Sequence, residues 1–404
     1  MSKLVIARAT RRDLLKGAAA ASLAGTSLVG AFPMPAIGQG APLKIGFMLP
    51  YSGTYAKLGK FIDEGFRLKV EQLGGKLGGR AVEYVQVDDE SEPGKATDNM
   101  NRLVGRDKVD VVVGTVHSGV VMAMAKIAKD TNTMLVVPNA GANDVTRAMC
   151  APNIWRTSFS NWQPCFPMGK VMYDAGHRNI MTITWRYAAG LEDVEAIKES
   201  FVKLGGKITE ELYLPFPQVE FQALITQIAQ KKPDAVFAFF AGGGAVKFVK
   251  DYAAAGLRTS IPLYGPGFLT DGTLPAQGAD AEGIKTTLHY ADDLDNPANK
   301  AFLAAFKQKT GQEGDVYAVQ GFDAAALLNV GLTATKGDFA AKDAMYTAMR
   351  AAKIDSPRGP ISFSKANNVV QNIYLREAKG GLNRYVSVAH ADLADPALGC
   401  RASS

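Results

Sequence analysis

The sequence has few of the residues from which metal and redox sites are built. Its 404 residues include four histidines and three cysteines, with no Cys-x-x-Cys pair and no His-Glu-x-x-His run. These absences exclude a zinc ribbon, a thioredoxin-type redox motif and a metalloprotease zinc site. The runs Gly-x-Ser-x-Gly, Gly-x-x-x-x-Gly-Lys-Ser/Thr and Gly-x-Gly-x-x-Gly are also missing. We therefore expect neither an enzyme nor a bound cofactor.

Excess positive charge is nearly absent once the N-terminal segment is set apart. The formal net charge is +6, but residues 1–40 contribute five basic residues against one acidic residue. The rest of the chain carries 40 basic and 38 acidic residues, a net charge of +2. Nucleic-acid-binding domains concentrate basic residues, so we expect no nucleic-acid partner.

Long apolar runs are missing as well. Residues 17–32 form a weakly apolar stretch rich in Ala, Gly and Ser, whereas a membrane-spanning helix needs about 20 strongly apolar residues. This stretch follows Arg11-Arg12-Asp13-Leu14-Leu15-Lys16, so residues 1–40 resemble a twin-arginine export signal. We expect cleavage near Gly38 or Gly40 and a soluble mature protein in the periplasm. The alternative is an ordinary amphipathic N-terminal helix.

The three cysteines, Cys150, Cys165 and Cys400, agree with an exported protein. An odd count in an oxidising compartment predicts one disulfide and one free thiol. Because a frayed chain end gains most from a covalent tie, we favour Cys150–Cys400. Cys150–Cys165 is the alternative.

Short apolar runs alternate with helical patterns along the mature chain. Strands are expected at 43–49, 82–87, 109–113 and 134–137, with helices at 60–73, 95–104 and 120–129. The same order then restarts, with strands at 179–184, 207–213, 235–240 and 262–264 and helices at 192–204, 221–230 and 245–255. Strands that are apolar on both faces and alternate with helices indicate a mainly parallel sheet covered on both sides. Two successive α/β units therefore predict two similar lobes.

The last part of the chain has a different pattern. Helices are expected at 299–309, 317–335 and 342–352, followed by a strand pair at 361–363 and 372–377. No low-complexity linker separates these parts, so short ordered crossovers are expected between the lobes.

Two turns at strand ends point to a binding site. Gly114-Thr115-Val116-His117-Ser118-Gly119 follows the third expected strand, and Pro138-Asn139-Ala140-Gly141-Ala142-Asn143 follows the fourth. Ligands of open α/β sheets bind beyond the carboxyl ends of the strands. Small residues there let backbone N–H groups approach an anion, and the Ser118 hydroxyl lies at a helix start. We expect a carboxylate; the alternative is that Ser118 only caps its helix.

Aromatic residues gather at other strand ends and turns. They are Tyr51, Tyr55, Trp162, Tyr187, Phe240, Phe268 and Phe322. Together they predict an apolar cleft for the body of the ligand.

These features together resemble the periplasmic solute-binding proteins of branched-chain amino acid ABC transporters, the Leu/Ile/Val-binding-like family. The resemblance is carried by Leu43-Lys-Ile-Gly-Phe-Met-Leu-Pro-Tyr-Ser-Gly53, Asp88-Asp89 with Pro93 and Ala96, Val111-Val-Val-Gly114 before Ser118, Val137-Pro138, and Gly256-Leu257 before Gly265-Pro266. It implies an α/β fold of the type I periplasmic-binding-protein class, with two lobes joined by three crossovers. The implied division is 42–158 plus 289–357 for the N-terminal lobe and 159–288 plus 358–404 for the C-terminal lobe.

The resemblance also implies roles for single residues. Ser118 and the backbone of Ala140 and Gly141 match the family's carboxylate anchor, Leu58 and Val116 match pocket walls, and Tyr187 and Ala189 lie in the segment that supplies an aromatic wall. The full set expected to contact the ligand is Tyr55, Leu58, Val116, His117, Ser118, Ala140, Gly141, Trp162, Tyr187, Phe240, Gly267, Phe268 and Phe322.

The sequence departs from the family pattern at the ammonium site. Members that bind an amino acid place a Glu after the Gly-Pro pair, but this chain has Gly265-Pro266-Gly267-Phe268. Gly141 also replaces a hydroxyl-bearing anchor residue. Burying an ammonium without a carboxylate costs several kcal/mol, so we expect an aromatic acid such as a benzoate, phenylpropenoate or aryl-pyruvate.

Hydrophobic amino acids, branched-chain ones included, are the alternative ligand, with Asp271, Glu192 or Asp323 supplying the missing charge. Either ligand implies the binding component of an ABC importer that closes about a hinge, makes and breaks no bond, presents its ligand to an inner-membrane permease and is a monomer. The competing classes are a ligand-sensing module for a membrane receptor and a secreted enzyme.

Overall fold

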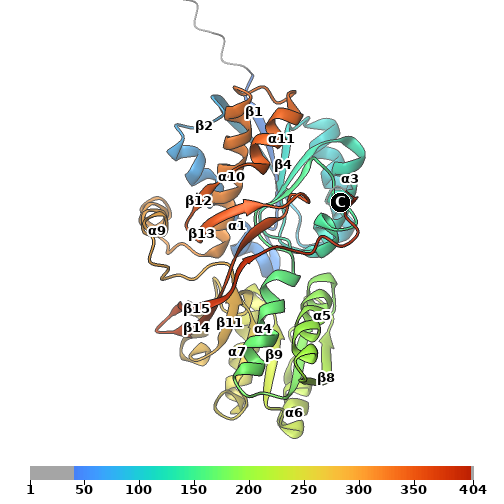
Figure 1. Cartoon of the computed structure of the whole chain (residues 1–404), viewed down its shortest axis with the longest axis vertical. Coiled ribbons are helices and arrows are strands. Elements are labelled where there is room, and N and C mark those ends of the chain that lie inside the picture. The colour runs from blue at the N-terminus through green and yellow to red at the C-terminus, as the bar shows by residue number, and fades with distance from the viewer. Residues whose placement is uncertain (1–40, 402–404) are drawn as a thin grey trace, which may run out of the picture. The chain divides into compact units, whose positions relative to one another are not determined.

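The computed structural model describes residues 41–401, arranged as two α/β lobes (Figure 1). The predicted export signal at 1–40 lies outside the described residues. Within residues 41–401, no helix combines the length and the hydropathy that crossing a membrane would require.

The first lobe is built on a sheet of six strands, counted over the described part of the chain, in the order β2-β3-β1-β4-β5-β6. The strands are β1 (Leu43–Leu49), β2 (Lys76–Leu77), β3 (Arg80–Asp88), β4 (Val111–Gly114), β5 (Met134–Val137) and β6 (Ile154–Arg156). All neighbours pair in parallel except β2 and β3. The helices of this lobe are α1 (Ala56–Gln72), α2 (Pro93–Asn101), α3 (Ser118–Thr131), α9 (Pro297–Thr310), α10 (Val316–Ala334) and α11 (Lys342–Arg350).

The second lobe has a larger, mixed sheet. Its order is β12-β13-β14-β11-β10-β9-β7-β8, with β15 paired to β14. The strands are β7 (Asn179–Trp185), β8 (Lys207–Leu214), β9 (Ala235–Phe239), β10 (Leu263–Pro266), β11 (Lys285–Leu288), β12 (Ile354–Ser356), β13 (Gly359–Phe363), β14 (Val369–Lys379) and β15 (Leu382–Leu393). The helices are α4 (Trp162–Asp174), α5 (Ala188–Lys203), α6 (Gln222–Lys231), α7 (Gly242–Ala254) and α8 (Leu274–Gln277). Strands β7 to β11 are parallel to one another, and β14 pairs with β11 in antiparallel orientation. The predicted fold class, two α/β lobes with mainly parallel sheets, is confirmed.

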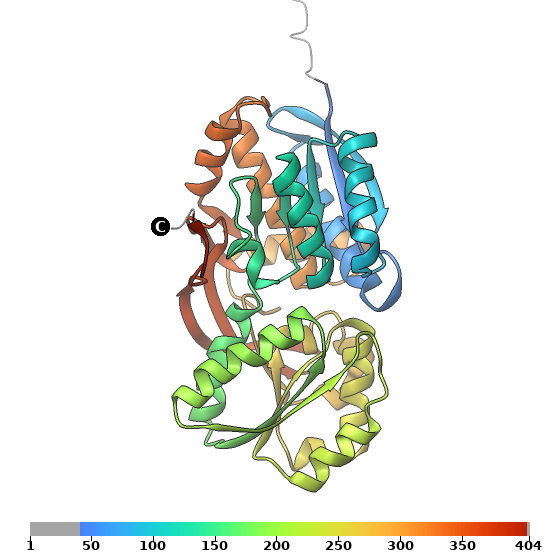
Figure 2. The ribbon, with the colours of Figure 1, turned by 90° about the vertical axis from the view of Figure 1, so that its right-hand side faces the viewer.

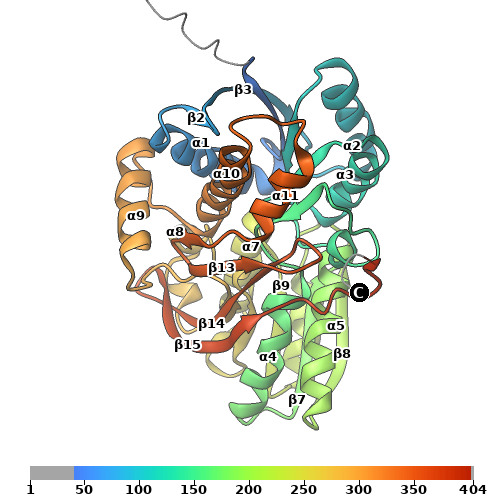
Figure 3. The same ribbon diagram turned by 45° about the horizontal axis from the view of Figure 1, so that its top comes forward.

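Helix α10 is the central helix of the first lobe. It is apolar around most of its circumference, because it packs between α1 and α11 (Figure 3). Two glycines permit the close approach to α1: a Cβ on Gly65 would lie 1.9 Å from the Ala318 carbonyl oxygen, and one on Gly321 would lie 1.9 Å from the Ile62 carbonyl oxygen. The helix start at Val316 is thereby fixed against the segment that follows β1.

The described chain passes between the lobes at 157–161, 289–296 and 351–353, and its end returns to the first lobe after β15. Figure 2 shows the outcome: the orange helices α10 and α11 share a lobe with the blue and teal N-terminal elements, whereas the green and yellow elements form the other lobe. Both lobes are therefore assembled from segments distant in sequence.

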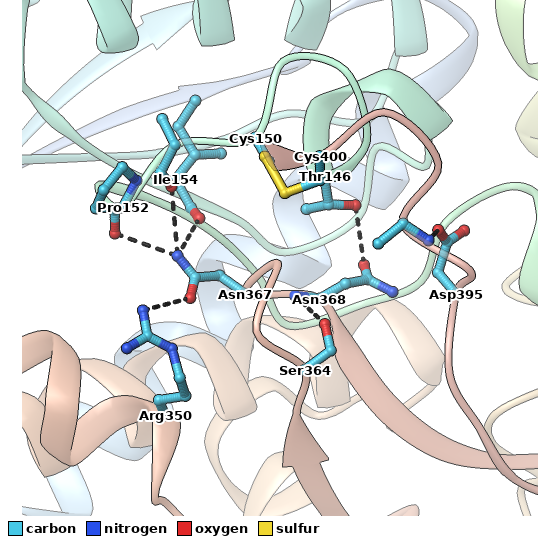
Figure 4. Close-up of a disulfide and its surroundings, with 12 residues drawn as sticks. Thr146, Cys150, Pro152, Ile154, Arg350, Ser364, Asn367, Asn368, Asp395 and Cys400 are labelled. Carbon is cyan, nitrogen blue, oxygen red and sulfur yellow. Dashed lines mark hydrogen bonds between the residues drawn. A yellow bond between two sulfur atoms is a disulfide. The ribbon is translucent and has the colours of Figure 1, made fainter. Parts of the chain in front are cut away.

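The end of the chain returns to the first lobe. After β15, Asp395 pairs with Arg147 at 2.9 Å and accepts the Ser160 hydroxyl at 2.6 Å. A disulfide joins Cys150 to Cys400 (Figure 4), and Cys165 is a buried free thiol. Of the two pairings that the sequence leaves open, this is the favoured one.

Candidate functional site

A cavity lies between the lobes, at the carboxyl ends of the strands. The first lobe and the first passage contribute Tyr55, Leu58, Val116, Ser118, Asn139, Gly141, Phe159, Asn161 and Tyr317, and the second lobe contributes Tyr187, Ala189, Phe239, Ala241 and Phe268. Both turns singled out in the sequence, those after β4 and β5, thus reach one cavity.

Ser118 is the first residue of α3, but it does not cap that helix. His117 is the N-cap, and its Nδ1 accepts the Gly119 N–H at 3.0 Å. Burial lowers the pKa of His117 to about 4, so its ring is neutral and Nδ1 can accept. The Ser118 oxygen accepts Asn161 Nδ2 at 3.3 Å. Within residues 41–401, neither the Ser118 hydroxyl nor its amide donates to a protein acceptor, and both stand at the positive end of the helix dipole.

Gly141 lies beside Ser118 in the turn after β5. Its carbonyl accepts the Asn161 N–H at 2.7 Å, while its own N–H has no acceptor among the described residues. A Cβ on Gly141 would lie 2.0 Å from Asn161 Oδ1 and 2.5 Å from Phe159 Cε2. Glycine is therefore needed for this turn to pack against the first passage. The pair of free donors, on Ser118 and Gly141, suits an anion.

The neighbouring Ala140 does not supply an anchoring amide, contrary to prediction. Its N–H donates to the Thr115 carbonyl at 2.9 Å, and its carbonyl accepts Arg156 Nη1 at 3.3 Å. Ala140 therefore ties the turn after β5 to the turn after β4.

Aromatic rings make up most of the remaining wall. Phe268 is central, with its ring centroid 4.8 Å from that of Phe159 and 6.4 Å from those of Phe239 and Tyr317. The Tyr187 ring lies 6.1 Å from Phe239. Rings at these separations form a continuous apolar surface.

A hydrogen bond between two tyrosine hydroxyls joins one lobe to the other. Tyr55, in the turn after β1, and Tyr187, at the start of α5, place their hydroxyl oxygens 3.0 Å apart. Burial raises the pKa of both phenols far above the ordinary value, so both stay protonated. The bond they share joins the walls of the cavity.

Three predicted contact residues lie behind the wall. His117 stacks on Tyr187 with centroids 4.5 Å apart and supports that ring. Phe240 packs in the second-lobe core, 5.1 Å from Trp185. It follows directly after β9, and because successive side chains alternate between faces, Phe239 is the residue that reaches the cavity. Gly267 abuts a buried ion pair, since a Cβ there would lie 2.3 Å from Arg376 Nη2.

Two other predicted residues lie outside the cavity lining. Trp162 begins α4, stacks on Phe166 at 4.4 Å and donates its indole N–H to Glu199 at 2.9 Å. Phe322 is in the first-lobe core, 5.3 Å from Phe302, on the next turns of α10 after Tyr317. The structure does not bring these two residues to the cavity, because proximity to a strand end or turn does not fix the direction of a side chain.

The acidic residues proposed to receive an ammonium are engaged elsewhere. Asp271 pairs with Arg376 at 2.6 Å, and Asp323 pairs with Arg358 at 3.0 Å, all four side chains being fully buried. Glu192 accepts the Asn143 N–H at 2.9 Å and Asn161 Nδ2 at 2.7 Å. None of these three acids lines the cavity, and residues 41–401 contain no cluster of three side chains suited to a metal ion.

The sequence prediction did not include several residues that line the cavity, namely Asn139, Phe159, Asn161, Phe239, Ala241 and Tyr317. Asn139 lies inside the predicted anchor turn and donates to Gln320 of α10 at 2.7 Å. Because Asn139 lies in that turn, the sequence could have identified it as a lining residue. Phe159 and Asn161 come from the first passage, whose path the pattern of strands and helices does not specify.

The chain resembles known proteins over nearly its whole described length. Residues 42–382 match the family described as periplasmic binding protein. The Leu/Ile/Val-binding protein homolog 6 of Brucella melitensis is 31% identical over 342 residues, which cover 83% of this chain and 87% of that protein.

Solved structures agree. A solute-binding protein of an ABC transporter from R. palustris, in complex with benzoate, is 52% identical with a TM-score of 0.88, and the match covers 89% of this chain and all of that one. Another, from Rhodopseudomonas palustris BisB5 in complex with 3,4-dihydroxybenzoic acid, is 31% identical with a TM-score of 0.83, covering 88% and 99%. The chain therefore belongs to the periplasmic solute-binding proteins of the Leu/Ile/Val-binding type that serve ABC transporters, and it has their type I fold.

Proposed function

We propose that this protein captures an aromatic carboxylate of the benzoate class for an ABC importer. The observation that carries the proposal is the pairing of free donors on Ser118 and Gly141 with a wall of aromatic rings in one cavity. The ligands named for the two R. palustris relatives, benzoate and 3,4-dihydroxybenzoic acid, support it.

The carboxylate is held at the start of α3. Its oxygens accept the Ser118 hydroxyl, the Ser118 N–H and the Gly141 N–H, and the helix dipole favours the negative charge. Hydrogen bonds to a charged acceptor are roughly twice as strong as neutral ones. The ring is then enclosed by Phe159, Phe239 and Phe268.

An α-amino group has no partner in this arrangement. Asp271 and Asp323 are already paired with arginines, and Glu192 accepts two hydrogen bonds from Asn143 and Asn161. An ammonium buried against Phe268 would cost several kcal/mol. A hydrophobic amino acid is the second candidate ligand, which the Leu/Ile/Val-binding relative favours.

Binding proceeds by closure of 42–158 plus 289–357 against 159–288 plus 358–404. Three hydrogen bonds connect the lobes beside the cavity: Tyr55 to Tyr187 at 3.0 Å, Lys57 Nζ to the Gly272 carbonyl at 2.7 Å and the Asn143 N–H to Glu192 at 2.9 Å. Closure forms these bonds and removes the ligand from water. The protein acts by binding alone and alters no covalent bond of its ligand.

The family indicates a periplasmic location. We further propose that the protein is exported by the twin-arginine route and acts as a monomer. The partner is an inner-membrane permease, and recovery of a receptor kinase in place of a permease after cross-linking in cells would favour the sensing role.

Thermal unfolding and calorimetric titration test the ligand class. Benzoate at about 100 times its Kd should add about 2.7 kcal/mol to the free energy of unfolding. Benzamide, which has the same shape without the charge, should add far less, and leucine should add none. Stabilisation by leucine with benzoate and its hydroxylated analogues inert would refute the proposal.

A further inference from the structure

One tyrosine that lines the cavity has a hydroxyl without a partner. Tyr317 lines the cavity, its hydroxyl oxygen is buried, and no hydrogen bond to it is formed by any residue of 41–401. The other two tyrosines of the wall, Tyr55 and Tyr187, bond each other. An unpaired buried hydroxyl costs free energy, so it calls for an explanation.

The carboxylates near Tyr317 are engaged with other donors. The neighbouring carboxylate, Asp271, already accepts both terminal nitrogens of Arg376, at 3.2 and 2.6 Å, and Asn383 Nδ2 at 3.4 Å. Asp315 accepts the backbone N–H groups of Tyr317 and Ala318. Burial raises the pKa of the Tyr317 hydroxyl far above its ordinary value, so the group stays a phenol that can both donate and accept.

Tyr317 and the carboxylate anchor come from different parts of the first lobe. Ser118 and Gly141 follow β4 and β5, whereas Tyr317 begins α10, which packs on α1. The Tyr317 ring lies beside Gly272 of the second lobe, where a Cβ would be 3.5 Å from Tyr317 Cε2. Ser118, Gly141 and Tyr317 line the same cavity, so a ligand whose carboxylate is held at Ser118 and Gly141 has its ring in the space that Tyr317 borders.

We infer, on the basis of the proposed function, that Tyr317 is a specificity-determining residue that hydrogen-bonds a hydroxyl group on the ligand ring. The preferred ligand is then a hydroxybenzoate rather than unsubstituted benzoate. The Tyr317 hydroxyl and the ring hydroxyl complete each other, because each is both a donor and an acceptor. A site built to pair with a hydroxyl discriminates against analogues that lack it.

Calorimetric titration with benzoate, 3-hydroxybenzoate, 4-hydroxybenzoate and the matching methylbenzoates tests the inference. The wild-type protein should bind the better hydroxybenzoate about 3–10 times more tightly than benzoate, and more tightly than the methylbenzoate of the same shape. Tyr317→Phe should reduce the preference to less than twofold.

Tyr346→Phe is the matched control. Tyr346 also has a buried hydroxyl without a partner in the described chain, but it packs on Trp155, away from the cavity lining. Its removal should leave the preference intact. Equal or tighter wild-type binding of benzoate, or a preference that survives in Tyr317→Phe, overturns the inference while benzoate binding itself still supports the proposed function. If no aromatic acid binds, both fail. The methylbenzoate comparison decides the matter on wild-type protein alone if the variant does not fold.

Discussion

Two residues at the cavity have hydrogen-bond donors that the protein itself does not use. Ser118 is buried, yet in the described structure its hydroxyl and amide hydrogens find no protein acceptor, and the Gly141 amide shares this property. Because His117 caps α3, the helix does not need the Ser118 side chain. The serine is thereby free for a ligand.

Ser118→Ala should weaken benzoate binding by about 1–2 kcal/mol, the scale of one hydrogen bond to a charged group. The affinity measured by calorimetry should fall roughly 5- to 30-fold. Ser200→Ala is the control, because that buried hydroxyl donates to the Ile197 carbonyl within α5 and is remote from the cavity. An unchanged affinity for Ser118→Ala would show that the anchor is elsewhere.

At this scale the sequence predicts part of the site. Ser118 and Gly141 were recognisable from small residues at strand ends. Phe239 was missed in favour of Phe240, because a shift of one residue in the expected strand end reverses the side-chain direction. Tyr317 was missed because it begins a helix that is apolar around most of its circumference, so that no face is marked as facing a ligand.

Whole elements carry the site residues into place. The start of α10 is fixed by Asp315, whose carboxylate accepts the Tyr317 N–H at 3.0 Å and the Ala318 N–H at 3.2 Å. The sequence predicted this helix to within a residue at each end, from its length and composition. Helix α4 was missed because Pro167 lies inside it, where proline normally interrupts a helix.

The cap of α10 should make stability depend on pH. Burial raises the pKa of Asp315 to about 7, so the folded state retains a proton that the unfolded chain loses near pH 4. Its contribution to stability is fully present below about pH 4 and is lost as the pH rises through 7. Asp315→Asn keeps the cap but cannot ionise. Its unfolding free energy relative to wild type should rise by up to about 4 kcal/mol between pH 4 and pH 8. Urea denaturation checks this, and a constant difference would contradict it.

The arrangement of the whole molecule was foreseeable only in outline. A repeated strand–helix order predicted two lobes, since each α/β unit must cover its own sheet. The path of the chain between the lobes was not foreseeable, because the residues along it, such as Phe159 and Asn161, follow no periodic pattern. The hydrogen bond between the Tyr55 and Tyr187 hydroxyls was not foreseeable either, because it joins segments 132 residues apart in the sequence.

The Cys150–Cys400 disulfide should contribute to global stability. It joins residues 250 positions apart, and a tie across so long a loop restricts the unfolded chain strongly. Replacing both cysteines with serine should lower the free energy of unfolding by roughly 2–5 kcal/mol. Reductant should destabilise the wild-type protein to a similar extent and leave the double variant unaffected. Equal stabilities under oxidising conditions would contradict the expectation.

That bond also makes a closed covalent ring of residues 150–400, which contains the whole second lobe and every passage between the lobes. A protease that cuts the exposed segment at 215–220 would therefore open the ring without separating the pieces. The two fragments would migrate as one species on a denaturing gel until a thiol is added. Neither lobe can be lost by a single cut within the ring.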